Sequence, residues 1–319
     1  RRRMVNLAEF RGGLLVLAGL VILLLLLAAF TPGLPGELLL QSLQFHIVAA
    51  GLALFVVMLL AGLRWRALVF FVLLAMGAAQ GAMLLGELHG RRGQALGSPP
   101  SVMLEVLSYN VLTGNPRAAE AARFIMESGA DVVVVMETPG IREYLDEIAA
   151  VYPYRVGCTD TGVCDLSVLS RHPVLDGQVH RMWPFRFERL LTVRIEKGGL
   201  PVTIVGAHFS KPYFDQASWG ETVQMTRILE RLDGDMVIAG DFNAAPWSET
   251  LVHLTRELAL APAPWHPATW PVIAGPLGVP IDNMFTRGNA RIVDMVAGEE
   301  SYGSNHRYLR ASVALYAAP

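Results

Sequence analysis

Polar side chains that can bind a metal ion or carry a proton stand at or near the ends of short apolar runs in this sequence. A single aspartate at the end of a strand is usually a turn residue or a helix cap. Six such positions in one stretch of chain instead favour a common site. The residues concerned are Asn110, Glu137, His208, Asp241 with Asn243, Asp282, and Asn305 with His306.

The residue types in this set indicate the chemistry. Carboxylate and amide oxygens are the ligands that hard cations such as Mg²⁺ prefer. A histidine near Asp282 could act as a general base, because a neighbouring carboxylate fixes the tautomer of an imidazole. The set therefore predicts a divalent-metal site with a general base beside it.

The short apolar runs predict the strands that carry these side chains. Helical patterns at 116–129 and 216–234 separate some of them, and the uninterrupted run VVVV indicates strands covered on both faces. Strands and helices mixed in this way are typical of one α/β or α+β domain. The predicted strands are 102–111, 131–137, 166–170, 190–196, 202–209, 236–243, 282–286 and 310–315.

The first quarter of the chain has a different composition. Hydrophobic residues make up 53% of the whole sequence, and the excess lies in three runs at 12–30, 43–63 and 67–86. Each run is about as long as a helix that crosses a hydrocarbon core of roughly 30 Å. A cleaved signal peptide would explain one run, not three, and buried helices of a soluble protein rarely stay uncharged for so long. The runs predict a three-helix transmembrane segment.

Arginines predict the orientation of this segment. They cluster within the first eleven residues and recur as Arg64 and Arg66, whereas the loop 31–42 contains no Lys or Arg. By the positive-inside rule the N-terminus is cytoplasmic, and three crossings leave the rest of the chain in the periplasm or outside the cell. We therefore expect a protein of the bacterial inner membrane, although Arg91 and Arg92 oppose this orientation.

The sequence thus divides into a transmembrane region (1–88), a polar linker rich in Gly and Pro (89–101) and one folded domain (102–319). The two cysteines of the chain, Cys158 and Cys164, both lie in the domain. Their spacing permits a small loop closed by a disulfide, which would suit an oxidising compartment. Two unpaired thiols are the alternative.

Several blocks of the sequence occur in the order found in one superfamily: LSYNVLTGN, VVVVME, LSVLSRHPV, VGAHFS, GDFNAAPWS, IDNMF and GSNHRYLRASV. On these blocks residues 102–317 resemble the endonuclease/exonuclease/phosphatase superfamily, which includes DNase-I-like nucleases, neutral sphingomyelinases and inositol polyphosphate phosphatases. The helical N-terminus and the stretch HPATWP (266–271) resemble its membrane-anchored bacterial branch. The resemblance implies a four-layer α/β sandwich, in which two packed mixed sheets are flanked by helices.

The resemblance also implies a role for each residue of the set. Glu137 would be the main ligand of Mg²⁺ or Mn²⁺, with Asn110 beside it. Asp241 and Asn243 would position the attacking water and the phosphate, and His208 would contact the scissile phosphate or stabilise developing charge. In-line attack by water would then cleave a P–O bond, while the metal offsets charge on the phosphoryl oxygens.

Asp282 and His306 would form the acid/base pair of this family. Arg171 and Lys211 are further candidates for binding the substrate phosphate, against the alternative that both are solvated surface residues. The closing motif of the family is usually Ser-Asp-His, and here Asn305, implied as part of the metal site, stands in place of the aspartate. Asn keeps the shape and a carbonyl acceptor but loses a negative charge. The site could bind metal more weakly, carry an engineered substitution that traps substrate, or belong to a degraded enzyme that only binds.

Together these patterns predict a membrane-anchored, metal-dependent phosphoesterase that acts on a phospholipid, a lipid-linked phosphate or a small phosphodiester. Residues 91–319 carry more acidic than basic side chains, which speaks against a domain that grips long nucleic acid. A periplasmic or extracellular nuclease is one alternative, and a catalytically impaired membrane protein that binds a phosphorylated ligand is the other. The transmembrane helices could also associate with copies of themselves.

Overall fold

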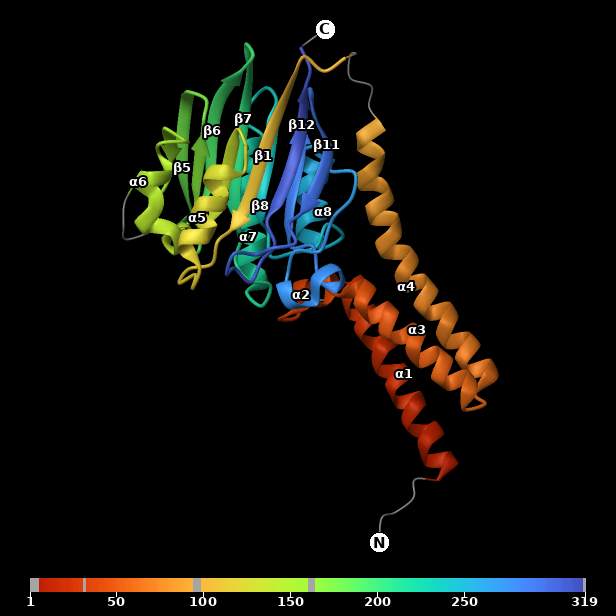
Figure 1. The fold of residues 1–319 in the computed structure, drawn as a ribbon. Helices are drawn as coiled ribbons and strands as arrows, with labels where there is room; N and C mark the ends of the chain where they lie inside the picture. Colours follow the sequence, from red (N-terminus) through yellow and green to blue (C-terminus); the bar gives the residue numbers. More distant parts are fainter. Residues whose placement is uncertain (1–5, 31–32, 94–98, 160–163, 318–319) are drawn as a thin grey trace.

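The computed structural model describes residues 6–30, 33–93, 99–159 and 164–317. The first three arginines of the predicted cytoplasmic end, and residues 94–98 of the predicted linker, lie outside the described residues. Figure 1 shows a helical N-terminal part that projects from a layered domain of strands and helices.

The N-terminal part consists of α1 (Leu7–Phe30), the short α2 (Glu37–Ser42), α3 (Gln44–Leu60) and α4 (Arg64–Gly90). In Figure 1 the turn between α3 and α4 lies at the end of the helices far from the domain. By length and composition α1 and α4 could cross a membrane, at about 36 Å and 40 Å of helix. In the most apolar 18-residue stretch of each helix, only 22% of α1 and 17% of α4 is buried. α3 is also apolar but shorter, with 17 residues. The apolar helices are therefore candidate membrane spans.

α4 continues beyond its predicted end and is attached to the domain. Glu87 near its C-terminus forms an ion pair with Arg256. Arg92, in the short 3-10 turn that follows, donates hydrogen bonds to the carbonyl oxygens of Pro262 and Ile292 at 2.9 Å and 3.2 Å. The first residues of the predicted linker therefore extend the helix along the domain.

Two six-stranded sheets pack face to face in the domain. The first has the order β11 (Ala290–Ala297), β12 (Leu309–Leu315), β1 (Val102–Asn110), β2 (Val132–Met136), β4 (Ser167–Ser170) and β3 (Tyr154–Val156). The second has the order β5 (Val174–Met182), β6 (Phe187–Lys197), β7 (Leu200–His208), β8 (Met236–Asp241), β10 (Asp282–Arg287) and β9 (Ala261–Pro262). The pairs β1–β2 and β7–β8 are parallel and the other pairs antiparallel, so both sheets are mixed.

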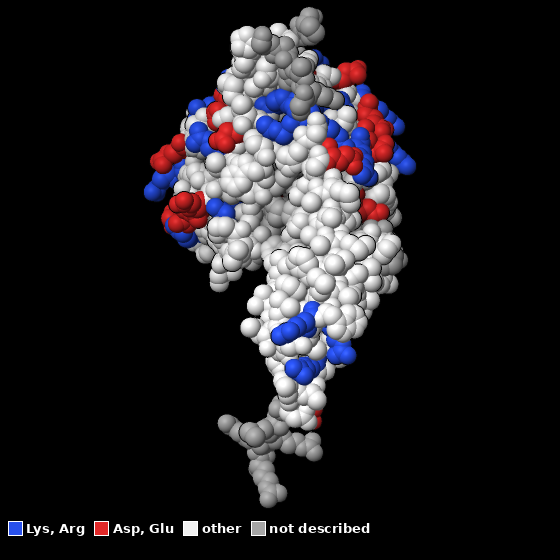
Figure 2. Space-filling view, turned by 90° about the vertical axis from the view of Figure 1, so that its right-hand side faces the viewer, with Lys and Arg blue, Asp and Glu red and all other residues white. Residues whose placement is uncertain are grey.

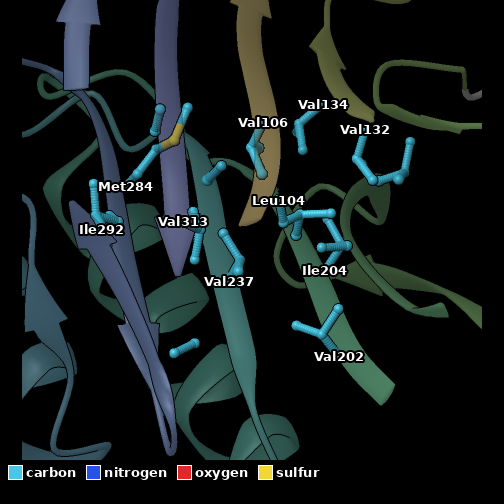
Figure 3. Close-up of a cluster of buried hydrophobic side chains, with 14 of the residues drawn as sticks. Leu104, Val106, Val132, Val134, Val202, Ile204, Val237, Met284, Ile292 and Val313 are labelled. Carbon is cyan, nitrogen blue, oxygen red and sulfur yellow. The ribbon is translucent and has the colours of Figure 1, made fainter. Parts of the chain in front are cut away.

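A core of aliphatic side chains fills the space between the sheets (Figure 3). Side chains alternate between the two faces of a strand, which explains the uninterrupted VVVV run. Val132 and Val134 of β2 belong to this core, whereas Val133 and Val135 pack on the opposite face with α5 (Ala118–Glu127). Both faces of β2 are covered, as predicted.

Helices form the two outer layers. α5, η2 (Thr138–Tyr144) and α6 (Leu145–Ile148) cover the first sheet, and α7 (Asp215–Leu229) and α8 (Glu249–Glu257) cover the second. A further 3-10 helix, η3 (Val272–Leu277), lies between β9 and β10. The four-layer sandwich is therefore confirmed.

Every predicted strand is present, but β3, β5, β9 and β11 were not predicted. β5 shows the reason most clearly. Its sequence VLDGQVHRM is largely exposed and contains no apolar run. Pairing with β6 along its whole length, rather than burial, makes it a strand.

Candidate functional site

Strand directions bring the predicted site residues of the first sheet to one edge. β1 and β2 run parallel and pair Asn110 with Met136, so Asn110 and the next residue after β2, Glu137, lie at the same end. β12 runs antiparallel to β1, so the loop before Leu309, which carries His306, reaches that end as well.

The second sheet gathers its site residues in the same way. β7 and β8 run parallel and pair His208 with Asp241, and the antiparallel β10 pairs Asp282 with Asp241. Asn243 follows β8 by two residues. We call the end of the sandwich where these strand termini meet the site edge; it holds Asn110, Glu137, His208, Asp241, Asp282 and His306.

Asn110 joins the two sheets at the site edge. Its amide nitrogen Nδ2 donates to Oδ2 of Asp241 at 3.1 Å and lies 3.3 Å from Oε1 of Glu137. Its Oδ1 accepts a hydrogen bond from the backbone N–H of Leu112 at 3.1 Å. The hydrogen bonds of the amide nitrogen and of the amide oxygen therefore fix the orientation of the Asn110 side chain. Asn110 thus connects the site residues of both sheets, and it does not only cap the end of β1.

Glu137 is held as an anionic oxygen donor. Its backbone has a φ of 56°, and Oε2 accepts a hydrogen bond from the backbone N–H of Thr113 at 2.6 Å. Burial raises the pKa of this carboxyl, but the Thr113 N–H, the charge of His208 and the Asn110 amide together lower it below the ordinary value. The side chain is only half-buried, so its carboxylate stays within reach of a ligand.

His306 and Asp282 form the predicted pair. Nδ1 of His306 lies 2.9 Å from Oδ2 of Asp282, and Nε2 lies 3.7 Å from Oδ2 of Asp241. Burial lowers the pKa of His306, but the carboxylates of Asp282 and Asp241 outweigh it and raise the pKa to about 9. Because the carboxylate of Asp282 can only accept, Nδ1 carries a proton and Nε2 faces the centre of the site.

His208 has a matching arrangement on the other side of Asp241. Its Nδ1 lies 2.7 Å from Oδ2 of Asp165, and its Nε2 lies 3.8 Å from Oδ2 of Asp241. Burial lowers the pKa of His208, but the charge and hydrogen bond of Asp165 raise it above the ordinary value. The guanidinium of Arg189 stands 3.6 Å from the same Asp165 oxygen.

Asp241 is the centre of this arrangement, since one of its oxygens faces both imidazoles. It is fully buried, and burial together with the charge of Asp282 raises the pKa of its carboxyl. Its other oxygen, Oδ1, accepts a hydrogen bond from the backbone N–H of Asn243 at 2.8 Å. A buried carboxylate with a raised pKa between two imidazoles is suited to exchange protons.

The GDFN block has the local geometry that this position requires. A Cβ on Gly240 would lie 1.8 Å from the carbonyl oxygen of Ala207, so a larger residue would separate β8 from β7. Asn243 has a φ of 50°, a conformation that Asn tolerates better than most residues. Its Nδ2 donates to the carbonyl oxygen of Phe209 at 2.9 Å, which ties the turn to the end of β7.

In the loop around Asn305, buried and exposed side chains alternate: Ser304 and His306 are buried, and Asn305 is exposed. Ser304 is buried, and its Oγ donates to the carbonyl oxygen of Asn110 at 2.6 Å and accepts from the backbone N–H of His306 at 3.0 Å. The Asn305 side chain is exposed, and its backbone oxygen accepts from Val272 at 3.1 Å. Ser304 thus positions His306, and residue 305 faces solvent at the site edge.

The two candidate phosphate-binding cations lie in different places. Arg171 follows β4, which pairs Ser170 with Val132 at the start of β2, so it stands at the end of the sheet opposite Glu137. Its guanidinium lies over the ring of Tyr152, 5.2 Å from the ring centre. Assigning Arg171 to the site is therefore wrong, because the antiparallel direction of β4 carries it away. Lys211 is exposed in the segment after β7, on the side of the site edge.

Cys158 and Cys164 form the predicted disulfide, although residues 160–163 between them lie outside the described residues. The bridge comes directly before Asp165, the partner of His208. The sequence patterns did not indicate Asp165. A signal was available, because Asp165 stands next to the strand LSVLS, and the other site residues also stand next to strands. Arg189 was also missed, and it has no local signal of its role. Ser304 belongs to the closing motif, but the sequence did not indicate that it positions His306.

The donor set fits a divalent cation. Asp241 and Asp282 offer carboxylate oxygens and His306 a ring nitrogen, and these atoms lie within 4.8 Å of one another. Because the raised pKa of about 9 keeps His306 protonated at neutral pH, the two carboxylates are the donors that a cation meets there. Glu137 adds a further carboxylate, linked to Asp241 through Asn110. Oxygen donors predominate, which suits Mg²⁺ or Mn²⁺ rather than a thiophilic metal.

The model of the Endonuclease/Exonuclease/phosphatase family matches residues 107–306, which contain every site residue described above. No curated protein matches the chain significantly.

Solved structures show the same fold at low sequence identity. An endonuclease/exonuclease/phosphatase from Bacteroides vulgatus is 17% identical, covers 67% of this chain and 100% of its own, with a TM-score of 0.59. D. rerio TDP2, solved with a single-strand DNA product, is 18% identical, covers 67% and 99%, and has a TM-score of 0.56. Sphingomyelinase C from Streptomyces griseocarneus is 18% identical, covers 66% and 99%, and has a TM-score of 0.50.

Proposed function

Since the chain belongs to the endonuclease/exonuclease/phosphatase family, we propose that it is a divalent-metal-dependent phosphoesterase anchored in a membrane by its N-terminal helices. The observation that carries this proposal is the buried Asp241 carboxylate, which faces Nε2 of both His208 and His306. Asn110 links it to the carboxylate of Glu137. Such a set can hold a phosphoryl group and move a proton to or from it.

Glu137 would hold the cation, Mg²⁺ or Mn²⁺. Asn110 would lie beside it and orient the Glu137 carboxylate through its amide nitrogen, with the exposed Asn305 nearby. When bound, the cation would offset negative charge on the phosphoryl oxygens of the substrate. The lowered pKa of Glu137 keeps its carboxylate ionised at neutral pH, as a metal ligand must be.

The remaining residues would orient water and carry protons. Asp241, positioned by the Asn243 N–H, would hold the attacking water in line with the P–O bond and accept its proton. His306, oriented by Asp282, would donate a proton to the departing oxygen, and its raised pKa keeps the imidazole protonated at neutral pH. His208, oriented by Asp165, would contact a phosphoryl oxygen.

The membrane anchor supports a lipid or lipid-linked phosphate as the substrate, because tethering raises the effective concentration of a substrate in the same bilayer. The three helices would place the N-terminus in the cytoplasm and the domain in the periplasm of a bacterial cell. The disulfide between Cys158 and Cys164 supports an oxidising compartment for the domain.

The test uses the purified full chain in detergent micelles, with bis-p-nitrophenyl phosphate as a soluble diester. We expect hydrolysis that requires Mg²⁺ or Mn²⁺ and is lost in Glu137→Ala and in His306→Ala. Arg171→Ala, at the opposite end of the sheet, is the matched control and should keep full activity. Equal activity of the wild type and both site variants would rule out the assigned site.

A nuclease is the second candidate function, because a relative with this fold was solved with a single-strand DNA product. The acidic excess of residues 91–319 opposes it. A plasmid-nicking assay at low salt separates the two candidates, since a lipid phosphoesterase should leave the plasmid intact. A chain that binds phosphate but hydrolyses neither substrate would instead be the impaired binding protein.

A further inference from the structure

Exposed apolar side chains gather at the site edge. Trp183 and Phe185 lie in the turn between β5 and β6, Tyr213 and Phe214 in the segment between β7 and α7, and Ile273 and Leu277 on η3. Their exposed fractions range from 45% for Phe185 to 95% for Ile273. We call these six residues the apolar rim. An exposed apolar collection of this kind marks a surface that contacts another apolar phase or partner.

The strand register places the first half of the rim beside the site. β6 is antiparallel to β7 and pairs Leu190 with Ala207, the neighbour of His208. The turn that precedes β6, with Trp183 and Phe185, therefore lies at the end of the sheet where His208 lies. The segment with Tyr213 and Phe214 follows β7 directly.

The second half of the rim joins the site to the N-terminal helices. The backbone N–H of Val272 donates to the carbonyl oxygen of Asn305 at 3.1 Å, which connects η3 with the loop of His306. Five residues later, the carbonyl oxygen of Leu277 lies 2.8 Å from Nε2 of His46, in the first turn of α3. η3 thus connects the site with the first turn of the apolar helix α3.

The connection between α1 and α3 docks on the same edge. Trp247, four residues after Asn243, donates its indole N–H to the carbonyl oxygen of Gln41 at 2.7 Å. Oγ of Ser42 accepts from the backbone N–H of Ala245 at 3.1 Å. Figure 1 shows α2 beneath the domain at this point, with α1 and α3 leading away from it. The helices therefore leave the domain at the site edge.

The rim adjoins the connection between α1 and α2. A cavity of about 430 Å³ is lined by Leu34 and Pro35 of the α1–α2 connection together with Trp183, Tyr213 and Phe214. No charged side chain lines this cavity among the described residues. Apolar side chains of the α1–α2 connection, Leu34 and Pro35, thus lie against the rim.

The distribution of charge agrees with this arrangement. In residues 6–90 the only Lys or Arg residues are Arg11, Arg64 and Arg66, at the end of the helices far from the domain. Figure 2 shows these blue groups below a white surface that extends up to the lower face of the domain. At the rim, the exposed Arg186 and Lys211 stand next to the aromatic residues. Aromatic rings beside basic side chains are typical of the interface between a bilayer and water.

We propose that the apolar rim lies in the interfacial layer of the bilayer that the N-terminal helices cross. The site edge then faces the membrane surface, and the substrates are phosphoesters in the headgroups of lipids in the adjoining leaflet. This inference rests on the proposed phosphoesterase function and on the membrane anchor. The rim defines where the substrate approaches, and Arg186 and Lys211 attract its anionic headgroup.

A labelling experiment tests the location of the rim without any activity. Both native cysteines are in a disulfide, so a cysteine introduced at Phe185 or at Leu175 is the free thiol that a fluorophore labels. Leu175 is the matched control, because it is an exposed apolar residue at the opposite end of β5. The full chain is reconstituted in nanodiscs of phosphatidylethanolamine and phosphatidylglycerol. Spin-labelled lipids should quench the fluorophore at 185 and not at 175; equal quenching at the two positions overturns the proposal.

An activity experiment tests the role of the rim. In phosphatidylethanolamine and phosphatidylglycerol vesicles, the double variant Phe185→Ser/Phe214→Ser should lose roughly tenfold or more of lipid hydrolysis, because two buried aromatic contacts with lipid are removed. Its hydrolysis of bis-p-nitrophenyl phosphate should equal that of the wild type and of Leu175→Ser. Equal changes on the two substrates overturn the proposal. A wild type that is inactive on both substrates overturns the proposed function instead, while the labelling result still decides the position of the rim.

Discussion

The two ends of the sandwich each hold an aspartate close to a histidine, yet their surroundings differ. At the site edge, Asp282 lies 2.9 Å from His306. At the opposite end, Asp131 lies 3.0 Å from Nε2 of His172. The two pairs have the same residue types and nearly the same distance between their side chains. An aspartate beside a histidine is therefore not enough to define a functional site.

The difference lies in how the carboxylate charge is balanced. Asp131 accepts hydrogen bonds from the ammonium of Lys197 and from the backbone N–H of Glu105, and its pKa is lowered although burial raises it. Asp131 thus connects the two sheets through Lys197, whose positive charge balances the charge of its carboxylate. At the site edge, several carboxylates converge without a lysine or arginine on Asp241 or Asp282 among the described residues. A surplus of buried negative charge is the feature that a metal ion and a proton can compensate.

The largest expected effect is on activity at the site edge. His306→Ala should lower kcat by about 10²–10⁴-fold, because it removes a positioned proton donor. Steady-state hydrolysis of bis-p-nitrophenyl phosphate measures the effect, and thermal unfolding checks that the variant is folded. A kcat within a factor of two of wild type (about the error of such assays) would contradict the assignment.

Asp131→Ala should have the opposite profile. It removes the hydrogen bonds that Asp131 makes with the half-buried Lys197 and His172, so the free energy of unfolding should fall by about 1–3 kcal/mol. Because Asp131 is remote from the site edge, kcat should stay unchanged in the folded variant. Denaturant unfolding measures the stability, and the same hydrolysis assay measures kcat. A loss of kcat without a loss of stability would contradict a purely structural role for Asp131.

Asn305→Asp tests the departure from the family. A new carboxylate about 4 Å from a divalent cation in exposed surroundings contributes roughly 2 kcal/mol, or about thirtyfold in Mg²⁺ affinity. Isothermal titration and hydrolysis at limiting Mg²⁺ both report it, with Asn305→Gln as the uncharged control. Activity that appears only in the Asp variant would instead identify the chain as an impaired enzyme that binds its ligand.

The smallest effect concerns pH. The pKa of Asp131 in the folded chain is lowered below the ordinary value of 3.8, so its charged form stabilises the fold above that pH. This contribution is lost as the pH falls through the lower folded pKa. The stability difference between wild type and Asp131→Asn should therefore be constant near neutral pH and shrink below about pH 4. A difference that grows in acid would show that the lowered pKa is wrong.

Much of the site could be predicted because its residues stand in local patterns. Asp241 and Asn243 belong to GDFN, and His306 follows Ser304 in a closing motif that occurs just before the last strand. Asp165 lacked such a pattern, since it follows a disulfide loop whose apparent role was structural. Arg171 was misplaced because a sequence cannot show which end of a strand faces the site.

The amino-acid sequence by itself determined the apolar helices, the strands and the types of side chain at their ends, because hydrophobic periodicity and turn residues act over a few neighbours. Only the tertiary structure decided which of these ends meet. Asp165 and His208 are 43 residues apart and His306 and Asp282 are 24 apart, and their contacts depend on strand order and direction. The same is true of the apolar rim, whose residues come from three separate segments. Strand pairing over long sequence distances brings them to the edge where the helices leave the domain, and local sequence does not encode that pairing.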